Sequence, residues 1–108
     1  MEVKTLEEYN KIFQEAIGRV VYRERKVRTG KFTTFCDEND IPKTTMNSLE
    51  NGKNDPRLIN SCRIMNCMGI EGIQFMELIN KELPENFWEE WRLAESEKDR
   101  KNQDSSNG

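Results

Sequence analysis

Four hydrogen-bonding side chains share one face of a short helix that the sequence predicts at residues 42–51. They are Lys43, Thr44, Asn47 and Ser48. If Met46 and Leu49 of this segment face a core, helical geometry turns the four side chains outward. Together they supply a cationic donor, an amide that both donates and accepts, and two hydroxyls. Such a face can form hydrogen bonds with a polar partner, although a helix face that meets only solvent has the same composition.

Residues that serve enzymes and metal sites are sparse in the chain. There is no histidine, and the three cysteines, Cys36, Cys62 and Cys67, form no Cys-x-x-Cys pair. A zinc site and a Gly-rich phosphate loop are therefore not indicated, and no group of carboxylates or lysines suggests general acid–base catalysis. We expect no enzymatic activity, no cofactor and no metal, with the cysteines packed as small hydrophobic residues.

Positive charge is concentrated in the middle of the chain although the net charge is -3. Residues 18–57 carry nine Lys and Arg residues against six acidic residues, whereas the segments on both sides are acidic. A basic block of this kind is found in nucleic-acid-binding proteins, but it is also common on solvated surfaces. Its position around residues 42–51 makes the polar helix face a candidate binding surface.

A long first helix is predicted from Thr5 to about Arg28. Thr5 and Glu8 have the spacing of a capping box, in which the threonine side chain bonds the backbone three residues on. Apolar residues then recur at steps of three and four, as on one face of a helix: Leu6, Tyr9, Ile12, Phe13, Ala16, Ile17, Val20 and Val21. Gly18 interrupts this run, so we expect a kink or a fresh start there.

The rest of the chain reads as further short helices. Predicted helices span residues 33–38, 42–51, about 55–68 with apolar Leu58 and Cys67, and 70–83 with Ile73 and Ile79; polar or glycine-containing turns separate them. We therefore predict an all-α protein with five helices and an added C-terminal helix. The expected organisation is an extension of the first helix (1–16), the main domain (17–83), an amphipathic helix (84–98) and a disordered tail (99–108).

The order of these pieces resembles the lambda-repressor-like family, also called the xenobiotic-response-element family. Its pattern has a short helix, a turn, and a Ser/Thr-rich helix that ends in Ile/Leu-Glu-x-Gly, matched here by Leu49-Glu50-Asn51-Gly52. The match extends without gaps from Ile17 to Gly69 and includes Arg25, Lys53 and Pro56. The resemblance implies a helix-turn-helix fold that binds double-stranded DNA as a transcriptional regulator, with residues 42–51 as the recognition helix in the major groove.

Family membership would give the candidate residues specific roles. Lys43, Asn47 and Thr44 have the chemistry to contact guanine, adenine, and a phosphate or thymine methyl group, respectively. The full DNA-binding set that we predict is Lys31, Thr33, Lys43, Thr44, Asn47, Ser48, Asn51 and Lys53, with Asn51 and Lys53 on phosphates. The resemblance also implies a structural ion pair between Arg25 and Glu50.

Two departures from the family pattern affect the start of the first short helix. Lys31-Phe32 stand where the family usually has Ser-Gln. Either the usual cap and phosphate contact would pass to Lys31 or Thr33, or the local register would slip by one residue. Thr29 occupies the usual glycine position and Gly30 a position that is commonly apolar.

Spare apolar residues near the C-terminus predict a homodimer. Phe87, Trp88 and Trp91 would form its interface, because a two-fold dimer doubles the DNA contacts. The alternative is that this last helix folds back onto the first helix of its own chain. A second hypothesis for function is a helix-turn-helix module that binds a protein, such as an antitoxin or an anti-repressor partner. No apolar run approaches a membrane span and no signal peptide is evident, so we expect a cytoplasmic protein that does not bind membranes.

Overall fold

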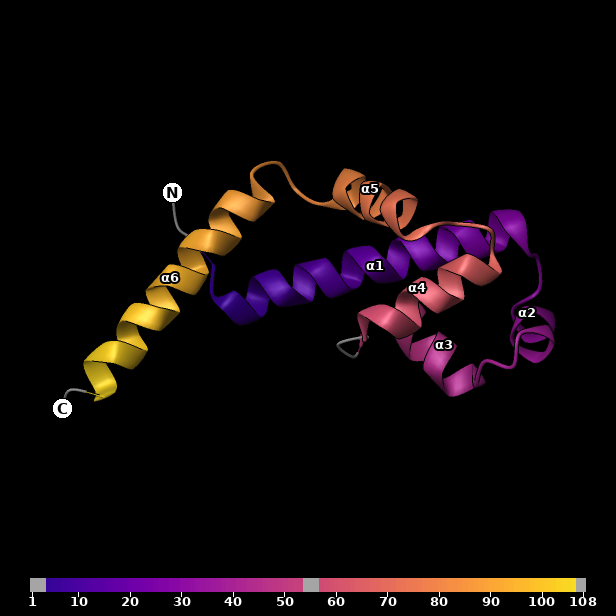
Figure 1. Ribbon diagram of the computed structural model, residues 1–108, viewed down its shortest axis with the longest axis horizontal. Coiled ribbons are helices and arrows are strands. Elements are labelled where there is room, and N and C mark those ends of the chain that lie inside the picture. The colour runs from indigo at the N-terminus through magenta and orange to yellow at the C-terminus, as the bar shows by residue number, and fades with distance from the viewer. Residues whose placement is uncertain (1–3, 54–56, 107–108) are drawn as a thin grey trace.

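The computed structural model describes residues 4–53 and 57–106, with only the backbone at 101–106. These residues form an all-α structure of six helices without strands (Figure 1). The helices are α1 (Leu6–Arg28), α2 (Phe32–Glu38), α3 (Lys43–Glu50), α4 (Leu58–Cys67), α5 (Gly72–Glu82) and α6 (Phe87–Ser106). None of the helices in these two ranges combines the length and apolarity needed to cross a membrane.

Helix α1 starts as the sequence predicts and is the central helix, against which α3, α5 and α6 pack. The Glu8 amide donates to Thr5 Oγ1 at 3.2 Å, and the Thr5 hydroxyl donates to Glu8 Oε1 at 3.2 Å. The helix is continuous from Leu6 to Arg28, so the fresh start that was one of the two expectations at Gly18 does not occur. Helices α2, α3 and α4 gather at one end of α1, and α6 lies at the other end (Figure 1).

Gly18 is present because two backbones meet there. A Cβ atom at this position would lie 2.6 Å from the Glu50 carbonyl oxygen and 2.8 Å from that of Leu49. Gly52, just after α3, has a φ of +62°, and a Cβ there would lie 2.9 Å from the Cα of Glu15. The C-terminal end of α3 therefore rests directly on α1, at a distance that only glycine permits.

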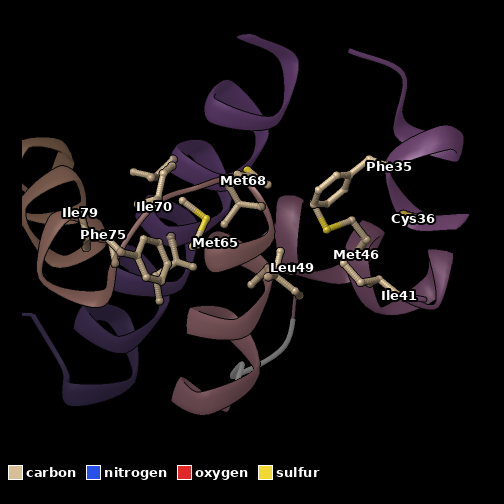
Figure 2. Close-up of a cluster of buried hydrophobic side chains, with 14 of the residues drawn as sticks. Phe35, Cys36, Ile41, Met46, Leu49, Met65, Met68, Ile70, Phe75 and Ile79 are labelled. Atoms are coloured by element: carbon tan, nitrogen blue, oxygen red, sulfur yellow. The ribbon is translucent and has the colours of Figure 1, made fainter. Parts of the chain in front are cut away.

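The main hydrophobic core joins α1 to α2, α3, α4 and α5, and Figure 2 shows most of it. Met46 is fully buried and Leu49 is 6% exposed, so α3 faces inward as its pattern predicts. Figure 2 labels these two residues among Phe35, Cys36, Ile41, Met65, Met68, Ile70, Phe75 and Ile79.

Three inward positions predicted from the sequence are wrong. Ile73 is 78% exposed, because α5 buries the stripe that contains Phe75 and Ile79 and Ile73 lies outside it. Leu58 is 68% exposed because it is the first residue of α4, beyond the edge of the core. Cys67 is also exposed, whereas Cys36 is buried as expected. The predicted start of this helix at Asp55-Pro56 lies outside the described residues.

Helix α6 packs against the N-terminal half of α1 and forms a second, smaller core. Tyr9, Phe87 and Ala94 are buried there, and Phe13 and Trp91 pack against them. The helix continues to Ser106, well past residue 98, where the sequence placed the start of a disordered tail. This stretch includes Arg100, Lys101 and Gln103, which favour helix, and Arg100 forms an ion pair with Glu97. Residues 107–108 of the expected tail lie outside the described residues.

Candidate nucleic-acid interface

The outward face of α3 carries the side chains that the sequence singled out. Lys43, Thr44 and Asn47 are exposed and Ser48 is half-buried at the edge of the face. On the opposite side, Met46 and Leu49 anchor the helix in the core. The structure therefore brings these four polar side chains together on one side of an eight-residue helix, and its inward side fixes their orientation.

A buried ion pair holds the end of α3 against α1. Arg25 Nε lies 2.5 Å from Glu50 Oε2, and Arg25 Nη2 donates to Glu50 Oε1 at 3.0 Å. Both side chains are only 7% exposed, and Arg25 Nη1 also donates to the Gly30 carbonyl oxygen at 3.1 Å. The hydrogen bonds that Arg25 donates to the Glu50 carboxylate raise the pKa of its guanidinium above the ordinary value. This bidentate geometry is the pair expected from the sequence, and it fixes the rotation of α3 as well as its distance from α1.

Two aromatic rings complete the surroundings of Arg25. The guanidinium carbon lies 5.0 Å from the centre of the Phe32 ring and 5.5 Å from that of Tyr22. Both distances are within the range of cation–π attraction. Phe32, the first residue of α2, thus packs on the ion pair and connects the start of α2 to the end of α3.

Acidic side chains surround the N-terminal end of α3. Lys43 Nζ lies 3.6 Å from Asp37 Oδ1 of α2, and both side chains are more than half exposed. Glu38 and Asp40 are exposed as well, and Asp40 has a φ of 56° in the turn between the two helices. These carboxylates lower the positive potential around Lys43, which the charge count over residues 18–57 did not reveal.

The amide of Asn51 is engaged with α3 itself. Asn51 Nδ2 lies 2.8 Å from the Asn47 backbone oxygen and 2.9 Å from Asn47 Oδ1. The sequence assigned this side chain to a phosphate, but the structure places it as a cap on the helix beside a candidate base-reading residue. Lys53, two residues further on, is exposed.

The two remaining candidates lie on α2. Lys31 is the N-cap residue of this helix and makes no side-chain capping hydrogen bond, and Thr33 lies in the first turn. Both are exposed. They therefore lie at the start of α2 and not on the outward face of α3.

A polar hollow beside Lys53 was missed by the sequence reasoning. It has a volume of about 500 Å³ and lies between α1 and the segment that follows α3. Lys11, Gln14, Asn51 and Lys53 line it together with Glu7 and Glu15, so its charge is mixed. The sequence feature that indicates this hollow is the spacing of Lys11 and Gln14 from Gly18, which places them on the face of α1 that meets α3.

The predicted dimer anchors are largely used within the chain. Phe87 is 3% exposed, and its ring centre lies 5.8 Å from that of Tyr9 and 6.2 Å from that of Phe13. Trp91 Nε1 donates to Asn10 Oδ1 at 3.2 Å, whereas Trp88 stays 43% exposed. The expectation that Phe87 faces a second copy is therefore wrong, because α1 of its own chain covers it.

Among the described residues, no cluster of three or more Cys, Asp or Glu side chains is arranged to hold a metal ion. In comparisons with known proteins, no family model, no curated protein and no solved structure matches this chain.

Proposed function

We propose that this protein is a sequence-specific regulator of transcription that binds double-stranded DNA through a lambda-repressor-like helix-turn-helix. In this proposal α2 crosses the DNA backbone and α3 enters the major groove. The observation that supports it is the exposed polar face of α3. Two contacts, at Gly18 and between Arg25 and Glu50, hold this helix against α1. A helix held at two points presents its side chains in a fixed register, which base readout requires.

The side chains of the interface divide into two groups by position. Lys43, Thr44 and Asn47 face outward from α3 and would contact base edges. Lys53 follows the helix and would contact a phosphate, as would Lys31 at the start of α2. Binding would therefore combine a sequence-dependent part with a part that depends mainly on salt concentration.

The test compares two lysine variants on a duplex selected from a random pool by the wild-type chain. Lys43→Ala should lower affinity for the selected duplex and relax the preference at one base pair, by about 1–3 kcal/mol. Lys53→Ala should weaken binding to all duplexes alike and lower the slope of log K against log salt by about 1. Lys98→Ala on α6, at the other end of the molecule, is the matched control and should change neither quantity. Absence of any salt-dependent binding to duplex DNA would refute the proposal.

A homodimer belongs to this proposal, because one recognition helix reads only a few base pairs. The exposed apolar residues of α6 that remain for such a contact are Trp88 and Leu93, the latter 59% exposed. Sedimentation equilibrium of the full chain tests it: we expect a dimer that Leu93→Glu dissociates without loss of helix content. A monomer at all concentrations would exclude a dimer in the absence of DNA.

The exposed acidic residues Asp37, Glu38 and Asp40 favour a second candidate, a helix-turn-helix module that binds a basic protein partner. Asp37→Asn separates the two. If α3 binds DNA, removing this charge beside Lys43 should tighten binding by up to about fivefold, the effect of an exposed charge pair. If the acidic residues bind a partner protein, the same variant should leave DNA affinity unchanged and weaken that complex.

A further inference from the structure

Asn51 and Asn47 form a pair whose hydrogen bonds fix the orientation of both amides. The Asn47 backbone oxygen can only accept a hydrogen bond, so the group that faces it at 2.8 Å must be the amide nitrogen of Asn51. The same nitrogen also donates to the Asn47 side-chain oxygen at 2.9 Å. The NH₂ group of Asn51 therefore donates to two oxygens of the same neighbour.

The orientation of Asn47 follows from that of Asn51. If the Asn47 amide were turned by 180°, its NH₂ group would face the NH₂ group of Asn51 and the contact would be repulsive. Asn47 is thus held with Oδ1 toward Asn51, which uses one of the two lone pairs of this oxygen. One lone pair and both N–H donors of Asn47 remain, and the side chain is exposed on the outward face of α3.

The edge that remains has the pattern that adenine requires in the major groove. Adenine offers an N–H donor at N6 beside an acceptor at N7, and an asparagine pairs with both through one oxygen and one nitrogen. A free asparagine populates two amide orientations and several side-chain rotamers, since its terminal torsion is broad. Fixing the amide in advance removes part of the entropy cost of ordering it on DNA.

We propose that Asn51 is a positioning residue that sets the preference of Asn47 for adenine, and not a phosphate ligand. This inference rests on the proposed function, because it assigns a specificity role within the same DNA interface. Its consequence is that a substitution at Asn51 changes the choice of base at one position, although Asn51 itself touches no base.

The experiment measures ratios of affinity at one base pair. A duplex is selected from a random pool with the wild-type chain, and the position at which Asn47→Ala loses its preference is identified. Four duplexes that differ only at this position are then titrated with wild type, Asn51→Leu, Asn51→Asp and Lys53→Ala. Leucine branches at Cγ as asparagine does but has no donor, and aspartate accepts where asparagine donates. Circular dichroism of each variant checks that α3 and the core are intact.

We expect the wild type to prefer adenine and Asn51→Leu to reduce this preference by about three- to tenfold, the effect of one or two exposed hydrogen bonds. Asn51→Asp should abolish it, because the carboxylate attracts the Asn47 NH₂ and turns the amide over. The added negative charge lowers affinity for all four duplexes equally, so it cancels in the ratio. Lys53→Ala should weaken all four duplexes with the ratio unchanged.

Three results would overturn the inference while DNA binding stands: a preferred base other than adenine, an unchanged ratio in Asn51→Leu, or an equal loss on all four duplexes in that variant. Failure of the wild-type chain to bind any duplex would instead refute the proposed function. The two failures are therefore distinguishable.

Discussion

Gly18→Ala tests whether α3 is seated directly on α1. The new Cβ would lie 2.6 Å from the Glu50 carbonyl oxygen, whereas such carbon–oxygen contacts are ordinarily about 3.3 Å or longer. Relief therefore requires the two backbones to separate by about 0.7 Å, against the Arg25–Glu50 pair. Overpacking of this kind costs about 1–3 kcal/mol, and alanine returns about 1 kcal/mol in helix propensity. The clashing atoms belong to the backbone and cannot move aside as a side chain can, so the upper half of this range applies and we expect a net loss of about 1–2 kcal/mol.

Urea unfolding followed by far-ultraviolet circular dichroism measures this loss as a lower midpoint at an unchanged slope. Gly72→Ala is the matched control, because a Cβ at this helical glycine meets nothing within 4 Å. Its stability should equal that of wild type or exceed it by up to about 1 kcal/mol, the gain in helix propensity. If Gly18→Ala were as stable as wild type, or gained the full helix propensity of alanine, the close contact between α1 and α3 would be refuted.

Two other predictions concern titratable groups. Hydrogen bonds from Arg23 and Arg19 lower the pKa of Glu82 below its ordinary value of 4.5, so its contribution to stability is present above that value and lost as the pH falls through the lowered pKa. Glu82→Gln should therefore be less stable than wild type at pH 7, by under about 1 kcal/mol because the arginines are exposed. The difference in unfolding free energy should vanish in acid, and a difference that grew in acid would contradict this prediction. Burial raises the pKa of the Cys36 thiol, so iodoacetamide should label exposed Cys67 in the native protein and Cys36 only on unfolding, as mass spectrometry of peptides would show. Equal labelling rates in the native state would place Cys36 outside the core.

The orientation of α3 was predictable from the sequence because it depends on local spacing. Met46 and Leu49 are three residues apart, so burying both turns Lys43 and Asn47 outward whatever the neighbouring helices are. The Arg25–Glu50 pair was reached only through the family resemblance, since nothing in the spacing of two residues that far apart requires contact.

Features that depend on how helices approach one another were not predictable. In the sequence alone, Gly18 indicates only a loss of helix stability. The need for glycine follows from the close approach of the α3 backbone, which the sequence does not reveal. Ile73 and Phe75 both suit an inward position on α5, and the neighbouring helices decide in favour of Phe75. The role of Asn51 likewise depended on the rotamer of Asn47, which no residue pattern encodes.

The division of the apolar residues into two clusters has a consequence for how the protein opens. Phe13 and Leu83 are the residues that pack against both clusters. Few contacts therefore connect the main core with the second core between α1 and α6. Cooperative units with few shared contacts can open separately, each with its own free energy. Amide hydrogens of α6 should therefore exchange at a lower opening free energy than those in the middle of α1. Detachment of α6 would uncover Tyr9 and Phe13 while α3 stays seated, and the outward polar face of α3 would remain intact in this partly open state.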